Sequence, residues 1–156
     1  MIRPLRLLLA AALLAPVLAC AAPPPSEPGT LAIRVSNVRN ARGMVHVDLC
    51  DQARFLGDGC PYAASAPAQT PVTTVVVRGL PPGRYAAQLF HDENANGRTD
   101  RNFLGIPKEG IAFSRDAPIR LSPPKWNDAQ FIYPGGAQAI AVRMRYFLGP
   151  AGPQDR

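Results

Sequence analysis

The chain has 156 residues, a formal net charge of +6, 18 prolines and 13 glycines. This length accommodates about one domain, and so much proline and glycine favours short strands with tight turns over long helices. The basic residues are scattered, without a run of three or more, so the composition lacks the clustered basic stripe that nucleic-acid binding requires.

The first residues are typical of an export signal. Arg3 and Arg6 precede an apolar run from Leu7 to Leu18, and basic, apolar and small segments in this order indicate a secretory signal peptide. The run is too short for a comfortable membrane span of about 20 residues. We favour lipoprotein processing, with cleavage before Cys20 and lipidation of its thiol, over ordinary cleavage within "ACA". Removal of residues 1–19 leaves 15 of the 17 basic residues and all 11 acidic ones. The formal net charge of the remaining chain is then +4.

This start predicts a simple domain organisation. Residues 1–19 form the signal peptide, and the proline-rich residues 20–29 suit a semi-rigid tether. Residues 30–148 form the folded domain, and residues 149–156 form a flexible tail. We therefore expect an exported protein that resides in the periplasm or is secreted, and that meets a membrane only through a lipid on Cys20.

Two cysteines remain in the domain once Cys20 carries lipid. Cys50 and Cys60 then form an even set, which in an exported chain favours a disulfide bond. The loop they close is short, so the expected stabilisation is about 2–3 kcal/mol.

Alternating apolar runs separated by turn signals begin at Thr30 and indicate an all-β domain. The clear runs are residues 31–38, 43–50, 71–79, 81–91 and 137–147. The third is β-branched nearly throughout, which favours a strand covered on both faces or at an inner position of its sheet, and one helical turn is expected near residues 125–130. About seven strands predict a single immunoglobulin-like or transthyretin-like β-sandwich, with a small closed barrel as the alternative.

The segment "DENANGRTD" is the strongest candidate site. Side-chain oxygens recur at alternate positions and a glycine stands at the sixth, as in the front half of an EF-hand calcium loop. The expected ligands are Asp92, Asn94, Asn96, the backbone carbonyl of Arg98, and Asp100. Because Phe103 replaces the bidentate glutamate of the twelfth position, Glu93 or Glu109 would have to complete a weak site.

Two other interpretations of this loop stay open. Asn-Gly and Asp favour tight turns, so the loop can be a metal-free structural turn. A small envelope enzyme could instead use His91, Asp92 and Glu109 for acid–base work, although adjacent strand residues point to opposite faces. His46 is expected to face solvent from its strand.

The loop that follows is expected to hold the acidic segment in place. We expect four of its apolar side chains to pack against the sandwich: Phe103, Leu104, Ile106 and Phe113. Lys108 and Glu109 would then lie at the loop mouth as a contact surface.

The stretch "GLPPGRYAAQLFHDENANGRTDRNFLGIPKEGIAFS" resembles the signature of the domain of unknown function 2141 family, a group of exported bacterial proteins. The matching positions are Gly83, Tyr85, Ala86, His91, Asp92, Asn94, Asn96, Gly97, Asp100, Asn102, Gly105, Pro107, Glu109, Gly110, Phe113 and Ser114. The resemblance implies one β-sandwich domain in the periplasm or on the cell surface, and implies no reaction. The cysteine pair and Ile111-Ala112 depart from the family pattern.

The sequence therefore predicts an exported, non-enzymatic β-sandwich module of the bacterial cell envelope. Its acidic loop is a structural or weak calcium site, and its expected partner is an envelope protein or a glycan. A small envelope enzyme and a metal-free structural module are the alternatives.

Overall fold

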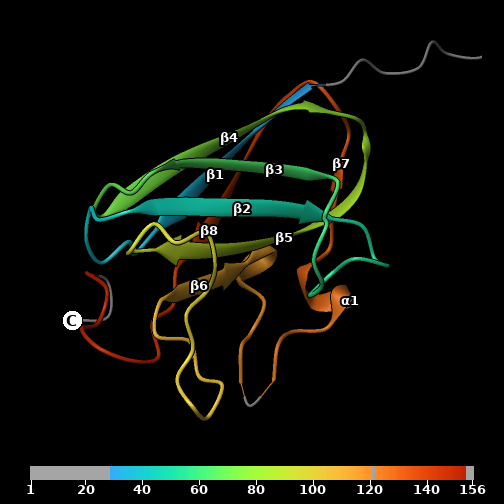
Figure 1. Ribbon diagram of the computed structural model, residues 1–156. Coiled ribbons are helices and arrows are strands. Elements are labelled where there is room, and N and C mark those ends of the chain that lie inside the picture. Colours follow the sequence, from blue (N-terminus) through green and yellow to red (C-terminus); the bar gives the residue numbers. More distant parts are fainter. Residues whose placement is uncertain (1–28, 121, 154–156) are drawn as a thin grey trace, which may run out of the picture.

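The computed structural model describes residues 29–120 and 122–153, which form a β-sandwich (Figure 1). The elements of this part are β1 (Gly29–Ser36), β2 (Met44–Cys50), β3 (Tyr62–Pro67), β4 (Val72–Leu80), β5 (Gly83–Asp92), β6 (Gly110–Phe113), the 3-10 turn η1 (Ser114–Asp116), α1 (Trp126–Ala129), β7 (Phe131–Tyr133) and β8 (Ala137–Arg143). The predicted signal peptide, most of the tether and Cys20 lie outside the described residues.

The described strands form two sheets, which confirms the predicted all-β sandwich. The smaller sheet has the order β4-β1-β8, in which β1 runs antiparallel to β4 and parallel to β8. The larger sheet has the order β3-β2-β5-β6, and β7 pairs with the beginning of β5. Because the sheets are separate, the described part is a sandwich and not the closed barrel considered as an alternative.

The main core lies between the two sheets. Alternate side chains of a strand point to opposite faces, so β1 buries Leu31, Ile33 and Val35 while β2 buries Val45, Val47 and Leu49. Each such side chain stabilises the fold by roughly 1.5–3 kcal/mol. The cluster extends from Leu31 to Met144 in the sequence, so the domain contains its own core.

Strand β4 differs from the expectation. It was expected to be covered on both faces or to lie at an inner position, but it forms an edge of the smaller sheet and alternates between buried and exposed side chains. Val75 and Val77 point into the core, whereas Val76 is 37 % exposed. Threonine and valine suit an extended backbone whether or not they are buried, so β-branched composition alone overestimated the burial.

A second, smaller cluster covers one end of the outer face of the larger sheet. It contains Ala86, Phe113, Ala117 and Ala129, and Phe55 and Trp126 pack against it. The Phe55 ring lies edge-on to Phe113 and to Trp126, with centroids 5.9 and 5.7 Å apart. The predicted helical turn is α1, which places Trp126 in this cluster.

The predicted disulfide bond between Cys50 and Cys60 is present, with the two Cα atoms 4.6 Å apart. Beyond β8, the expected tail contacts the domain at Pro150, whose carbonyl accepts a hydrogen bond from Arg39, as does the carbonyl of Leu148 just before the tail. No helix among the described residues has the length and apolar character to cross a membrane.

Candidate functional site

The acidic loop begins with Asp92, the last residue of β5, whose side chain is buried. One carboxylate oxygen accepts a hydrogen bond from the Asn96 N–H at 3.0 Å and the other from the Gly97 N–H at 2.7 Å. Burial alone would raise the pKa of Asp92, but these N–H groups and His46 outweigh it, so the pKa lies below its ordinary value. Gly97 has φ +78°, which allows the sharp turn that brings its N–H to the carboxylate.

Asp100 accepts hydrogen bonds from the two asparagine side chains of the loop. The amide groups of Asn94 and Asn96 donate to the same Asp100 oxygen at 2.7 and 3.1 Å. The exposed Arg98 side chain pairs with the other Asp100 oxygen, with its Nε 3.7 Å away. Asn94, Asn96 and Asp100 therefore lie together, as the alternating pattern predicts.

Glu109 reaches back across the chain to close the loop. Its carboxylate is buried, and its two oxygens accept hydrogen bonds from the N–H groups of Glu93 and Asp100, each at 3.0 Å. One side chain thus ties together both ends of the acidic segment. Sequence spacing left this contact open, because it depends on how the chain folds back.

Glu93 points away from the loop centre toward residues 39–42. Its carboxylate pairs with Arg39 and Arg42 and accepts a hydrogen bond from the Asn40 amide at 2.7 Å. Burial would raise the pKa of Glu93, but these partners lower it further than burial raises it. Glu93 thus joins the acidic loop to the loop between β1 and β2.

The loop offers few free oxygens to a cation. N–H donors already engage both oxygens of Asp92, Glu93 and Glu109. The described residues contain no group of three or more His, Cys, Asp or Glu side chains that could hold a metal ion. A calcium ion beside Asp100 would need the amides of Asn94 and Asn96 to rotate, so that their oxygens face it in place of their NH2 groups.

The candidate acid–base residues do not converge on one point. His91 is buried, with one ring nitrogen 2.8 Å from the Tyr146 hydroxyl and the other 2.9 Å from the Arg42 carbonyl. Burial lowers the pKa of His91 more than its neighbours raise it. Asp92, the next residue on the strand, faces the opposite side of the sheet, and Glu109 is fully engaged by backbone N–H groups.

His46 lies beside Asp92 on that opposite face and is not the fully solvent-facing histidine that we expected. Its side chain is 26 % exposed and its Nε2 lies 3.5 Å from the Asp92 carboxylate. Its ring stacks on Phe90, with centroids 4.7 Å apart. Cross-strand pairing in the larger sheet explains the stack, because His46 and Phe90 are register partners.

A groove of about 730 Å³ lies on the outer face of the larger sheet, a site that sequence analysis missed. Its floor is formed by β2, β5 and β6 through Asp48, Gln88, Phe90, Ile111 and Phe113. One wall is the hairpin after the acidic loop, and the other is formed by the disulfide loop and the segment after η1. In Figure 1 the hairpin (yellow) and the segment after η1 (orange) project in the same direction beyond β6.

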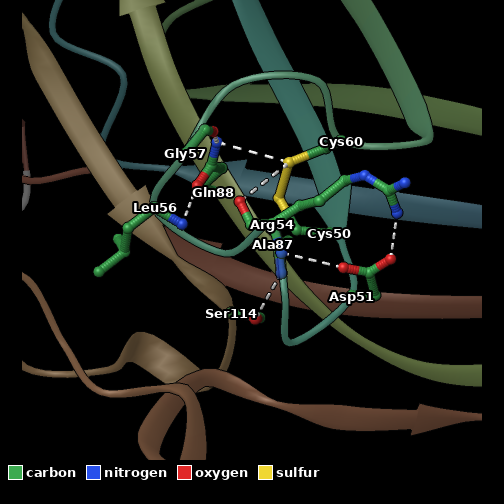
Figure 2. The surroundings of a disulfide bond; sticks show 9 residues. All are labelled: Cys50, Asp51, Arg54, Leu56, Gly57, Cys60, Ala87, Gln88 and Ser114. Carbon is green, nitrogen blue, oxygen red and sulfur yellow. Dashed lines mark hydrogen bonds and ion pairs between the residues drawn. A yellow bond between two sulfur atoms is a disulfide. The ribbon is translucent and has the colours of Figure 1, made fainter.

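The disulfide loop is fixed to the groove floor by Gln88 (Figure 2). The Gln88 amide oxygen accepts a hydrogen bond from the Leu56 N–H at 3.1 Å, and its NH2 group donates to the Gly57 carbonyl at 3.2 Å. Leu56 has φ +67° and is 46 % exposed at the groove. A leucine in this left-handed conformation is strained by roughly 1–2 kcal/mol, and such strain is concentrated at functional sites.

The groove combines apolar and charged side chains. Leu56, Leu104 and Ile106 add apolar surface to the walls, and Arg98, Arg101 and Arg120 provide positive charge. Burial raises the pKa of Asp48 on the floor; Gln88 and His46 oppose that rise and Asp58 adds to it. Asp48 and Asp58 also line the groove, so three arginines against two aspartates leave a formal charge of +1, which suits a ligand with an apolar body and an anionic group.

The hairpin itself corrects one expectation. Phe103 and Leu104 were expected to pack against the sandwich, but they are 94 % and 68 % exposed, whereas Phe113 is buried. The turn at Asn102 to Gly105 carries the two side chains away from the sheet, because it is closed by its own hydrogen bonds. Lys108 is exposed at the base of this hairpin, next to the buried Glu109.

Comparison with known proteins places the chain among bacterial proteins without an assigned function. A family model described as "Uncharacterized protein conserved in bacteria (DUF2141)" matches residues 33–141. No curated protein and no solved structure matches the chain.

Proposed function

The chain belongs to the DUF2141 family of uncharacterized bacterial proteins, and from this premise we propose that it is an exported, non-enzymatic binding module of the cell envelope. Its binding site is the groove on the outer face of the larger sheet. The acidic loop is the rigid support of one groove wall. A periplasmic location, with or without a lipid on Cys20, is part of the same proposal.

The single observation that carries this proposal is the groove lining. The apolar part of the floor, formed by Phe90, Ile111 and Phe113, lies between two walls that carry arginines. Ligand sites are typically concave and apolar with a few charged or polar groups that orient the ligand. Of the two partners expected from the sequence, a segment of an envelope protein fits an apolar floor better than a glycan does.

The hydrogen bonds of the acidic loop support its role in holding the hairpin wall in place. Buried carboxylates that accept several backbone N–H groups form strong, charge-assisted hydrogen bonds. Asp92 and Glu109 together hold four backbone N–H groups in the loop from which the hairpin starts. The hairpin wall is therefore held in position before any ligand arrives, which lowers the entropic cost of binding.

The disulfide bond supports the exported location. Disulfide bonds form and persist in oxidising compartments such as the periplasm, and Cys50–Cys60 closes the loop that forms the second wall. This agrees with the export signal expected at the start of the sequence.

Titration with 8-anilinonaphthalene-1-sulfonate tests the groove, because this fluorescent probe joins apolar rings to an anionic sulfonate. We expect its fluorescence to rise on binding the chain from residue 21 onward, and Ile111→Glu to weaken the binding about tenfold or more by placing a charge on the apolar floor. The control is Ile132→Glu, because Ile132 is 72 % exposed on β7 and does not line the groove.

Circular dichroism must show that both variants keep the fold, since partly unfolded states also bind this probe. Equal binding by the Ile111→Glu and Ile132→Glu variants would show that the probe does not use the groove and would contradict the proposal.

A further inference from the structure

The hairpin tip presents two large apolar side chains to solvent. Phe103 is 94 % exposed and its neighbour Leu104 is 68 % exposed. Single exposed apolar residues are ordinary on protein surfaces, but adjacent ones on a projecting tip indicate a contact site. The tip extends away from both sheets, beyond β6 (Figure 1).

Local hydrogen bonds fix the tip in this exposed conformation. The side-chain oxygen of Asn102 accepts hydrogen bonds from the N–H groups of Leu104 and Ile106 at 3.0 and 2.9 Å. The backbone of Asn102 bonds to Ile106 and to Gly105, each at 2.9 Å. Phe103 is therefore held outward by its neighbours.

The hairpin and the acidic loop carry exposed basic residues near the apolar tip. Arg98, Arg101 and Lys108 are all exposed, and Arg101 donates to the Gly105 carbonyl at 3.0 Å, which places its guanidinium group beside the tip. Asp100 is engaged by Asn94 and Asn96 and pairs with Arg98, and Glu109 is buried. The hairpin thus offers apolar side chains with Arg101 beside them and two further exposed basic residues on the same loop.

We propose that this tip inserts into an anionic phospholipid bilayer. Phenylalanine and leucine enter the boundary between headgroups and acyl chains, where flanking arginine and lysine side chains remain beside anionic headgroups. This charge complementarity favours a lipid surface over a neutral partner. Phe103 does not line the groove, although Leu104, Arg98 and Arg101 do, so substitution of Phe103 tests the tip without changing the groove lining.

Vesicle co-sedimentation tests the proposal with the chain from residue 21 onward, which lacks Cys20 and therefore any lipid anchor. The vesicles contain phosphatidylcholine with about one third phosphatidylglycerol. We expect binding to these vesicles and none to pure phosphatidylcholine. Phe103→Glu should weaken binding about tenfold or more, and Arg98→Ser or Arg101→Ser about fivefold each.

The matched control is again Ile132→Glu, which changes an exposed apolar residue on β7 to the same acidic residue and should bind vesicles as the unmodified chain does. A second measurement uses Phe103→Trp, whose fluorescence should shift to the blue and be quenched by brominated lipids.

Three outcomes would overturn the proposal. These are the absence of vesicle binding at low salt, equal binding of the Phe103→Glu and Ile132→Glu variants, and binding with no blue shift in Phe103→Trp. The last would mean attraction of surface charge alone. Loss of probe binding in Ile111→Glu with intact vesicle binding would separate the groove from the tip.

Discussion

At the scale of single residues, the acidic loop uses most of its charge to hold its own backbone. Carboxylates that accept N–H groups replace the hydrogen bonds that a tight loop cannot make along its chain. Asp92 holds the turn at Asn96 and Gly97, and Glu109 joins the two ends of the segment. This arrangement explains why a short loop contains so many acidic residues.

Calcium binding remains a prediction at this scale, and Asp100 is the residue that tests it. Calcium at about 100 times its dissociation constant should add roughly 2.7 kcal/mol, a rise of several degrees in melting temperature for a domain of this size. The measurement is thermal unfolding in excess chelator and then in millimolar calcium. The rise should disappear in Asp100→Asn, because that change removes the carboxylate between the two asparagines.

Asp58→Asn is the matched control, since Asp58 is an exposed carboxylate on the disulfide loop. If calcium does not raise the melting temperature of the unmodified chain, the loop is a metal-free turn. Its role in holding the hairpin in place is then unchanged.

His91 predicts a pH dependence of stability. Because burial lowers its pKa below 6.5 in the folded protein, the unfolded chain takes up the proton more readily. Above pH 6.5, His91 is neutral in both states and the folded protein keeps its full stability. This stability is therefore lost as the pH falls through 6.5 toward the lower pKa of the folded state. Asp92 and Glu93 titrate below their ordinary values of 3.8 and 4.5, outside this interval.

Urea unfolding at pH 7.5 and pH 5.5 measures this effect. We expect the His91→Gln variant to lose less free energy of unfolding than the unmodified chain between these two pH values, although it is less stable at both because it loses hydrogen bonds of the ring. Equal losses in the two proteins would show that His91 takes up its proton equally well in the folded state.

At the scale of elements, sequence periodicity identified the strands that have one buried face. The five predicted runs correspond to β1, β2, β4, β5 and β8. Strand β3 was missed because small residues dominate its sequence, YAASAP, and give little apolar contrast between its faces. Strands β6 and β7 have only four and three residues, which is too short for alternation to be recognised.

The candidate site was predictable only where its residues are close in sequence. The acidic cluster could be recognised from its spacing, whereas the Glu109 contact depends on a chain reversal. The groove requires three strands and several loops from different parts of the chain, so no local pattern indicates it. The exposure of Phe103 was predicted wrongly because apolar character was interpreted as burial, although surfaces contain many apolar atoms.

Leu56 on the disulfide loop is expected to contribute to ligand binding at a cost in stability. Leu56→Ala and Leu56→Gly both remove the apolar side chain from the groove wall, so both should weaken binding of the anilinonaphthalene probe several-fold. Glycine adopts φ +67° freely whereas alanine remains strained. The glycine variant should therefore be more stable than the alanine variant by about 1 kcal/mol.

Urea unfolding and probe titration of the two variants provide both measurements. An alanine variant as stable as the glycine variant would show that the loop relaxes to a negative φ, and Leu56 would then not be a strained wall of the groove.

At the scale of the whole molecule, the two sheets have different roles. The smaller sheet closes the main core, and the outer face of the larger sheet carries the acidic loop, His46 and the groove. The two groove walls have independent supports: the hairpin is held by Asp92 and Glu109, and the opposite wall by the disulfide bond and Gln88. One wall can therefore be loosened without the other.

Replacing both cysteines, Cys50→Ala with Cys60→Ala, tests this independence. The loss of a short disulfide loop should lower the free energy of unfolding by about 2–3 kcal/mol, while the sandwich remains folded because the main core includes no residue of that loop. Probe binding in the groove should weaken because Leu56 is less well held. Vesicle binding through Phe103 should be unchanged, because the hairpin keeps its own hydrogen bonds. If probe binding and vesicle binding were both lost, the two walls would form one cooperative unit. The groove and the tip would then be parts of a single contact surface.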